Sequence, residues 1–348
     1  MNEIYLTIFF ISLLLFLLGS GVWVALSMVA VSAIGMMLFT SRPVGDAMAT
    51  TIWGTSSSWS LTALPLFVWM GEILFRTKLS ENLFKGLSPW LSRLPGGLIH
   101  VNVVGCALFA AISGSSAATV ATVGKMSIPE LRKRKYPEKL LLGSLAGSGT
   151  LGLLIPPSII LIIYGVTIED SIAKLFMAGI LPGIMIALIF MSYVVIWSIL
   201  NKKLMPKNLQ NFSFSQKIKA SKQLFPVILL ITSVIGSIYT GIATATEAAS
   251  LGVLGALVLS WFQQTLNTKT FKLSLLGATK TSCMIAFILA GSTFLSLAMG
   301  FTGLPRNLAV WINNMNLSPF MLIFILTIFY IILGMFLDGI SAVVLTMA

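Results

Sequence analysis

Apolar intervals without charged residues alternate along the chain with short segments that contain lysine and arginine. Each interval matches one or two spans of about 20 residues, which is the length of helix that crosses the hydrocarbon core of a bilayer. This pattern predicts an all-α polytopic membrane protein embedded in the lipid bilayer. The charge-free intervals cover residues 6–41, 47–71, 140–168, 175–201, 223–246 and 248–268.

The composition agrees with this prediction. The 348 residues are 57% hydrophobic, whereas soluble domains are about 45–50% apolar. The formal net charge is +12, but the cations lie in short loops between the apolar intervals, so we expect no nucleic-acid partner. The first apolar interval follows Glu3 and lacks a cleavage site of small residues, which predicts an uncleaved first helix.

Two strongly basic loops predict the orientation of the chain. The first is RKRK at 132–135, and the second, at 201–222, contains six lysines. Basic residues are retained on the cytoplasmic side of a membrane. Two predicted crossings, at 140–168 and 175–201, separate these loops and return the chain to the same side, so both loops can be cytoplasmic.

The stretch AAISGSSAATVATVG, residues 110–124, predicts a re-entrant hairpin. No Lys, Arg, Asp or Glu occurs between Arg93 and Lys125, and a single crossing here would place one of the flanking basic clusters outside. A hairpin that turns at residues 113–116 keeps both clusters inside. Because non-helical backbone at this depth must be buried or line a polar cavity, the turn indicates a binding site. In the alternative interpretation, the small residues only allow two membrane helices to pack closely.

The stretch GTLGLLIPPSIILIIYG, residues 149–165, predicts a helix that is interrupted inside the membrane. Pro156 and Pro157 remove two backbone donors and strain the preceding turn. The freed carbonyls are suited to a sodium ion, and the N-terminus of the following half-helix is suited to a carboxylate. Alternatively, the prolines only kink a helix that packs against its neighbours.

The second half of the chain shows a similar order of elements from the opposite predicted face. After two further crossings, an outward helix over 283–299 leads to an interfacial arm over 300–317. This arm corresponds to an arm over 79–95 in the first half. Each arm precedes an apolar run that ends in a small, polar turn, and the second turn is LDGISAV at 337–343.

Related elements on opposite membrane faces are typical of inverted repeats, whose substrate and ion sites meet near the midplane. We predict a first repeat over 1–200, a Lys-rich cytoplasmic linker over 201–222 and a second repeat over 223–348. Asp338 in the second turn would cost roughly 2.5–3.5 kcal/mol to insert, which makes it a candidate functional residue. Alternatively, it lies at a helix end and reaches interfacial water.

Two other polar segments have structural interpretations that we favour. Ser116 could act as a nucleophile with His100 as its base, but about a dozen residues separate this lone histidine from the serines, and an interfacial histidine is more often only solvated. In ATATEAASLG, residues 243–252, we expect threonine and Glu247 to begin a helix, because threonine caps helices and glutamate favours their first turn.

Together these stretches resemble the large membrane subunit of tripartite ATP-independent periplasmic (TRAP) transporters, the DctM-like proteins. The resemblance implies a sodium-driven secondary transporter in the bacterial inner membrane. It also implies two partners, a four-helix small membrane subunit and a periplasmic binding protein that delivers a small carboxylate. The implied fold has two inverted repeats, each with a re-entrant hairpin and a broken helix, in an elevator-type transporter. The matching stretches are ALPLFVWMGEIL, LPGGL, FAAISGSSAATVATVG, LGLLIPPSIILIIYGV, SIAKLFMAGILPG, TATEAAS and GMFLDGISAVVLT.

The resemblance also implies roles for individual residues and no enzymatic activity. Such proteins usually continue to a further broken helix, so we expect the second repeat to be incomplete here. An ion channel with the same hairpins and, less favoured, an intramembrane serine hydrolase are the alternatives. The implied sodium ligands are Ser113, Gly114, Ser115, Gly149, Pro156, Asp338 and Gly339. The implied substrate-binding residues are Ser115, Ser116, Thr119, Pro157 and Ser158.

Overall fold

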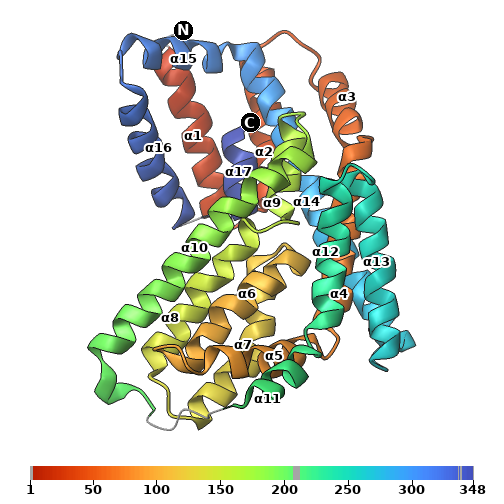
Figure 1. The fold of residues 1–348 in the computed structure, drawn as a ribbon. Helices are drawn as coiled ribbons and strands as arrows, with labels where there is room; N and C mark the ends of the chain where they lie inside the picture. The colour runs from red at the N-terminus through yellow and green to blue at the C-terminus, as the bar shows by residue number, and fades with distance from the viewer. Residues whose placement is uncertain (1–2, 207–211, 336, 338, 348) are drawn as a thin grey trace. The chain divides into compact units, whose positions relative to one another are not determined.

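A computed structural model describes residues 3–206, 212–335, 337 and 339–347, and all regular elements in these ranges are helices (Figure 1). The chain forms two compact units. Unit 1 combines Met1–Leu61 with Cys283–Ala348, and unit 2 is the continuous segment Thr62–Ser282. These units are defined by contacts within the fold, whereas the repeats are predicted from the order of elements along the sequence. The repeats stay a prediction.

Unit 1 contains the first helices of the chain and the last ones. Its N-terminal part ends within a short 3-10 helix at Trp59–Thr62, whose last residue belongs to unit 2. Its C-terminal part starts within α14, a 35-residue helix that begins in unit 2. The elements are α1 (Glu3–Gly19), α2 (Val24–Phe39), α3 (Val44–Ser56), α14 (Thr268–Thr302), α15 (Leu304–Asn314), α16 (Pro319–Gly334) and α17 (Gly339–Met347).

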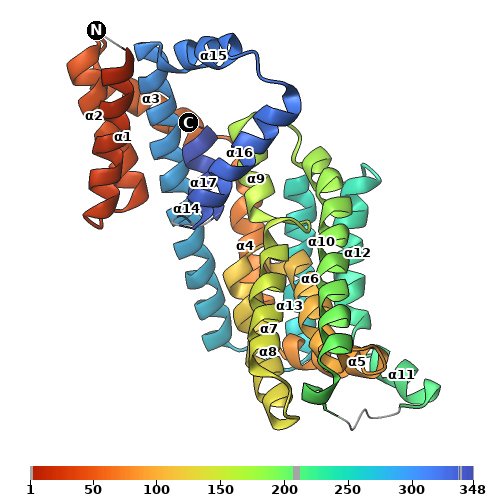
Figure 2. The same ribbon diagram turned by 90° about the vertical axis from the view of Figure 1, so that its left-hand side faces the viewer.

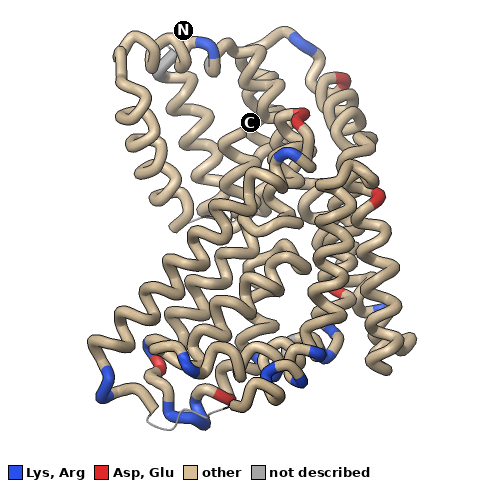
Figure 3. The backbone as a smooth tube through the Cα atoms, viewed as in Figure 1, with Lys and Arg blue, Asp and Glu red and all other residues tan. Residues whose placement is uncertain are grey.

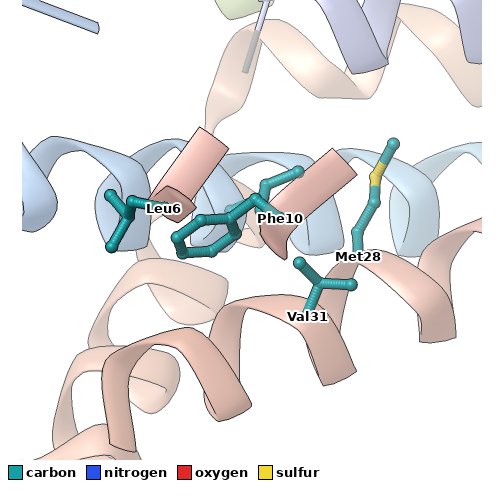
Figure 4. Packing of buried hydrophobic residues seen from close by; sticks show 5 residues of the cluster. Leu6, Phe10, Met28 and Val31 are labelled. Atoms are coloured by element: carbon teal, nitrogen blue, oxygen red, sulfur yellow. The ribbon is translucent and has the colours of Figure 1, made fainter. Parts of the chain in front are cut away.

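Close packing of apolar side chains joins the two parts of unit 1. Leu6 and Phe10 of α1 meet Met28 and Val31 of α2 (Figure 4), and Leu295 of α14 belongs to the same buried cluster. All five are at most 9% exposed. Burial of side chains of this size contributes roughly 1.5–3 kcal/mol each, so contacts between distant parts of the sequence hold this unit together.

The end of unit 1 is a second helical hairpin. Tyr330 Oη of α16 donates a hydrogen bond to Thr346 Oγ1 of α17 at 3.0 Å. Ser292 Oγ of α14 donates to the carbonyl of Val344 at 2.7 Å, which ties α17 to α14. Helix α16 ends at Gly334 and α17 begins at Gly339, so residues 339–343 of the predicted polar turn are helical. Asp338, the candidate ion ligand of this turn, lies outside the described residues.

Unit 2 contains the segments that the sequence links to a binding site. Its α-helices are α4 (Ala63–Phe75), α5 (Leu79–Leu91), α6 (His100–Ser113), α7 (Ser116–Lys133), α8 (Glu138–Gly149), α9 (Ile159–Thr167), α10 (Ile172–Leu200), α11 (Phe214–Ser221), α12 (Phe225–Tyr239) and α13 (Ala245–Phe262). Short 3-10 helices lie at Gly97–Ile99, Thr150–Leu153 and Lys202–Leu204. Helices α6, α7 and α8 lie side by side, with α10 along α6 and α8, and α13 packs along α4 (Figures 1 and 2).

Length and composition identify three described helices that can each cross a membrane, α10, α13 and α14. The number rises to five if two bent helix pairs, α3 with α4 and α11 with α12, each form one span. Many apolar side chains of α10 and α16 are exposed, for example Leu181 at 77% and Phe320 at 86%. Such surfaces are suited to lipid or to another apolar partner.

One predicted boundary is wrong. The sequence predicts an outward helix at 283–299, whereas α14 already begins at Thr268 and includes Lys269, Lys272 and Lys280. Lysine is a good helix former, so charged residues at the start of a span do not interrupt the helix. Both predicted arms are helical, as α5 and α15.

Candidate functional site at the tip of the first hairpin

Helices α6 and α7 form a helical hairpin, as the sequence predicts. The backbone N–H of Leu98, just before α6, donates a hydrogen bond to Tyr136 Oη, just after α7, at 3.1 Å. Tyr136 is buried, and this burial raises the pKa of its hydroxyl, which keeps the group protonated. The two ends of the hairpin therefore lie together at its base, and the tip lies at the far end of both helices.

A left-handed residue makes the turn at the tip. Gly114 has φ 58° and ψ 7° and ends α6. Ser115 is the N-cap of α7, and its Oγ accepts a hydrogen bond from the N–H of Ala118 at 3.4 Å. Glycine is favoured at such a φ because a Cβ atom would be strained there. The sequence therefore locates the turn correctly at Ser113–Ser116.

Hydroxyl groups connect the two limbs at the tip. Thr119 Oγ1 donates to the carbonyl of Ser115 at 2.8 Å and lies 2.9 Å from Ser113 Oγ. Either hydroxyl can be the donor in this pair, and Ser113 Oγ also donates to the carbonyl of Ser115 at 3.4 Å. Ser113 Oγ also accepts from the N–H of Ser115 at 3.4 Å. Both hydroxyls thus stabilise the turn.

The predicted helix break is present between α8 and α9. Helix α8 ends at Gly149, a 3-10 turn follows, and α9 begins only at Ile159. The Pro156–Pro157 peptide bond is cis. Four successive carbonyls, from Leu154 to Pro157, accept no hydrogen bond from any described residue. Unpaired carbonyls are costly where the backbone is buried, as at Pro156 and Pro157, and carbonyl oxygens are suitable ligands for a cation.

The hairpin tip packs directly against this break. The N–H of Ile159 donates to the carbonyl of Gly114 at 3.4 Å. A Cβ atom on Gly114 would lie 2.9 Å from the carbonyl oxygen of Pro157, and one on Gly152 would lie 3.0 Å from the backbone of Ser115. A Cβ on Gly149 would overlap Val120 of α7. The absence of side chains at these glycines allows the two backbones to approach.

Three hydroxyls near the tip are buried without a partner among the described residues. They are Ser116 Oγ and Thr122 Oγ1 of α7 and Ser148 Oγ of α8. An unsatisfied buried polar group costs roughly 1–3 kcal/mol, and such groups typically contact water or an ion. Ser158 differs, because its Oγ donates to the carbonyl of Leu153 at 2.6 Å.

The predicted site residues therefore have different outcomes. The structure brings one set together at the meeting of tip and break: Ser113, Gly114, Ser115, Ser116, Thr119, Gly149, Pro156, Pro157 and Ser158. Gly339 begins α17 in unit 1, and Asp338 is outside the described residues. The described part of the chain contains no cluster of three His, Cys, Asp or Glu side chains that could hold a metal ion. The ligand roles of all these residues stay predictions.

The alternative histidine–serine pair is not formed. His100 is the first residue of α6 and Ser116 the first of α7, at opposite ends of the hairpin. The 14 residues of α6 place them about 20 Å apart along the helix. His100 Nε2 instead lies 2.7 Å from the carbonyl oxygen of Pro95.

The structural role expected for Glu247 is confirmed. Its Oε2 accepts hydrogen bonds from the N–H and Oγ1 of Thr244, each at 2.8 Å. The N–H of Glu247 in turn donates to Thr244 Oγ1 at 3.3 Å, which completes a capping box at the start of α13.

Three residues that hold the hairpin in place are not among the residues predicted from the sequence. A Cβ on Gly71 of α4 would lie 3.0 Å from Ser113 Cα, so α4 supports the tip closely. Gly152 supports the opposite side, and Tyr136 closes the base. The glycine in the otherwise bulky stretch ALPLFVWMGEIL was the available signal for Gly71. The contact of Tyr136 with Leu98 has no local sequence signal.

Comparison with known proteins identifies the family. The family model described as the tripartite ATP-independent periplasmic transporter, DctM component, matches residues 10–348. The chain belongs to this family. This membership, together with the apolar helices, makes it a multi-pass membrane permease component of the TRAP type and not an enzyme.

Relatives with curated names agree. The chain is 33% identical over 317 residues to the C4-dicarboxylate TRAP transporter large permease protein DctM of Pseudomonas aeruginosa, covering 91% of this chain and 73% of that protein. It is 30% identical to the sialic acid TRAP transporter large permease protein SiaM of Vibrio cholerae, covering 94% and 76%. It is also 30% identical to the isethionate TRAP transporter permease protein DctMQ of Oleidesulfovibrio alaskensis, covering 93% and 51%.

Proposed function

We propose that this TRAP permease is the large subunit of a sodium-coupled secondary transporter that imports a small carboxylate across the bacterial inner membrane. The observation that carries the proposal is the packing of the Ser113–Ser116 turn against a helix break with four unpaired carbonyls. Broken helices and re-entrant turns of this kind supply ion and substrate ligands in secondary transporters.

Helix ends divide the site into two electrostatic regions. The C-terminus of α6 ends at Gly114, and the carbonyls before α9 lie beside it. Their partial negative charge favours a cation, which Ser113, Gly114, Ser115, Gly149 and Pro156 would surround. All these ligands are neutral oxygens, and we infer that they bind a monovalent ion, Na⁺.

The N-termini of α7 and α9 provide the opposite polarity. Helix α7 begins at Ser116 and α9 at Ile159, so both helices direct positive dipole ends toward the meeting point of tip and break. An anionic carboxylate is favoured at such helix starts. We therefore place the substrate near Ser115, Ser116, Thr119, Pro157 and Ser158. The unpartnered Ser116 hydroxyl supports this placement.

The substrate class and the partners come from the relatives. The names of these relatives include C4-dicarboxylate and sialic acid, so we infer a small organic acid without choosing among them. About half of the DctMQ relative lies outside the match, which is compatible with a second permease component in that polypeptide. We propose that a small four-helix membrane subunit and a periplasmic binding protein assemble with this chain.

The second hairpin would complete the transporter. Helices α16 and α17 have the same helix–turn–helix order as α6 and α7. We propose that Asp338 and Gly339 provide a second sodium site within an inverted repeat, and that the transporter works by an elevator-type movement.

Uptake by proteoliposomes tests this proposal. With the binding protein and the small subunit present, we expect labelled carboxylate to accumulate only with an inward sodium gradient. Ser115→Ala and Asp338→Asn should weaken the sodium dependence. Ser233→Ala is the matched control, because this exposed hydroxyl bonds only to Leu230 O within α12. Uptake that is unaffected by removal of sodium refutes the coupling, and sodium flux without the binding protein favours the channel alternative.

A further inference from the structure

A pocket of about 400 Å³ lies at the base of the first hairpin, at the opposite end from its tip. Its wall includes Arg93, the glycine pair before α6, Tyr136 after α7, and Ser198 and Lys202 at the end of α10. These segments are far apart in sequence and meet only in the fold. The pocket belongs entirely to unit 2, and the predicted transport site does not use it.

The pocket is strongly cationic. Arg93 and Lys202 are exposed, and neither forms an ion pair with a described residue. None of the described lining residues is Asp or Glu. The nearest acids along the chain, Glu130 and Glu138, are paired with Arg134 and Arg132. The two lining cations are therefore available to an anion.

Uncharged groups in the wall also favour an anion in the pocket. The continuous helix formed by Gly97–Ile99 and α6 begins at the pocket, and its positive dipole end favours an anion nearby. The N–H groups of Gly97, Leu98 and Ile99 already donate to Leu94 O, Tyr136 Oη and Gly96 O, so the helix contributes its dipole and not free donors. Ser198 is 4% exposed, and its Oγ has no partner among the described residues. A Cβ on Gly96 would lie 2.6 Å from Val194 and 3.1 Å from Ser198 Oγ, so glycine allows this wall to pack closely against α10.

The position of the pocket indicates the kind of anion. Basic residues of unit 2 gather at the end that carries α5 and α11 (Figure 3), and the positive-inside rule makes this end cytoplasmic. Helix α10 is long and apolar enough to span the membrane. Its last residues, Ile199 and Leu200, are 48% and 78% exposed. An apolar chain can therefore follow α10 while a charged group occupies the pocket.

We propose that this pocket binds a phosphate-bearing anion through the side chains of Arg93 and Lys202, in the field of the nearby helix dipole. Basic pockets between membrane helices on the cytoplasmic side are suited to anionic lipid headgroups. A phospholipid headgroup and free phosphate share this chemistry, so the experiment separates them. The inference does not depend on sodium coupling or on the substrate.

Thermal unfolding of the full chain in detergent tests the proposal. The probes are short-chain phosphatidylglycerol, phosphatidylcholine with the same chains, and inorganic phosphate. The double variant Arg93→Gln/Lys202→Gln, here called the Gln pair, removes the two lining cations. Lys139→Gln/Lys219→Gln removes two exposed cations that do not line the pocket. A charge-preserving variant, Arg93→Lys/Lys202→Arg, separates a loss of charge from a loss of fold.

We expect phosphatidylglycerol to raise the unfolding temperature saturably and phosphatidylcholine to have little effect. The Gln pair should raise the apparent dissociation constant about 30-fold, from roughly 1 kcal/mol for each cation, while the other two variants behave like the unmodified chain. An equal effect of inorganic phosphate at equal concentration identifies free phosphate as the source and supports the site. No shift with either anion, or equal shifts in the Gln pair and the unmodified chain, overturns the proposal.

Discussion

Substitution of the glycine at the hairpin tip separates the contribution of backbone conformation from that of close packing. In Gly114→Ala the new Cβ is strained at φ 58°, which costs roughly 1–2 kcal/mol. The Cβ would also lie 2.9 Å from Pro157 O and 3.0 Å from Ile159 N, so tip and break must move apart. Loss of the hydrogen bond between Ile159 and Gly114 adds about 0.5–1.5 kcal/mol. We expect a total destabilisation of about 1.5–3.5 kcal/mol.

Two other glycines provide matched controls. Gly241 has φ 72°, but a Cβ atom there would have no neighbouring atom within 4 Å, so Gly241→Ala has the strain without the contact. Gly143, in the middle of α8, has neither a positive φ nor an atom within 4 Å of the position that a Cβ would take. Gly143→Ala should therefore stabilise the helix by up to about 1 kcal/mol. The free energy of unfolding in detergent and the sodium dependence of uptake are measured for all three. The reasoning is wrong if Gly114→Ala is no less stable than Gly241→Ala and titrates with sodium like the unmodified protein.

Two further predictions concern the base of the hairpin. Tyr136→Phe leaves the N–H of Leu98 without its acceptor and should destabilise the protein by about 1–3 kcal/mol. Hydrogen exchange at the Leu98 amide should become faster, and an unchanged exchange rate contradicts the prediction. The second prediction uses single cysteines, Arg93→Cys or Arg132→Cys, in a protein that lacks Cys106 and Cys283. Each cysteine should react with a membrane-impermeant thiol reagent only from the cytoplasmic side. Labelling of the two positions from different sides excludes the re-entrant topology.

The sequence predicts those parts of the site that depend on local chemistry. A glycine among serines locates the turn at Gly114, and two adjacent prolines locate the break at Pro156–Pro157. Charge distribution predicts that the chain turns back, because Arg93 and the 132–135 loop must lie on the same side. The turn, the break and the return of the chain each have a direct physical reason within a few residues, and the structure contains all three.

The features that the sequence did not predict depend on packing between distant residues. The contact of Gly71 with Ser113 and that of Tyr136 with Leu98 join different helices. Packing between distant residues also joins the two chain segments that make up unit 1. Leu295 packs with Phe10, and a Cβ on Gly291 would lie 2.8 Å from Ala25 O. Hydropathy along the chain gives no information about such partners.

The discontinuity of unit 1 has a consequence for biosynthesis. Residues 62–282 are continuous, so this part can reach its final packing while the ribosome is still producing the rest. Helices α1 and α2 are made first, yet Leu295 of α14, which completes their buried cluster, is synthesised only after the whole of unit 2. The earliest helices must therefore wait in the bilayer with an unfilled apolar face, and lipid or a membrane chaperone has to cover that face until α14 is inserted.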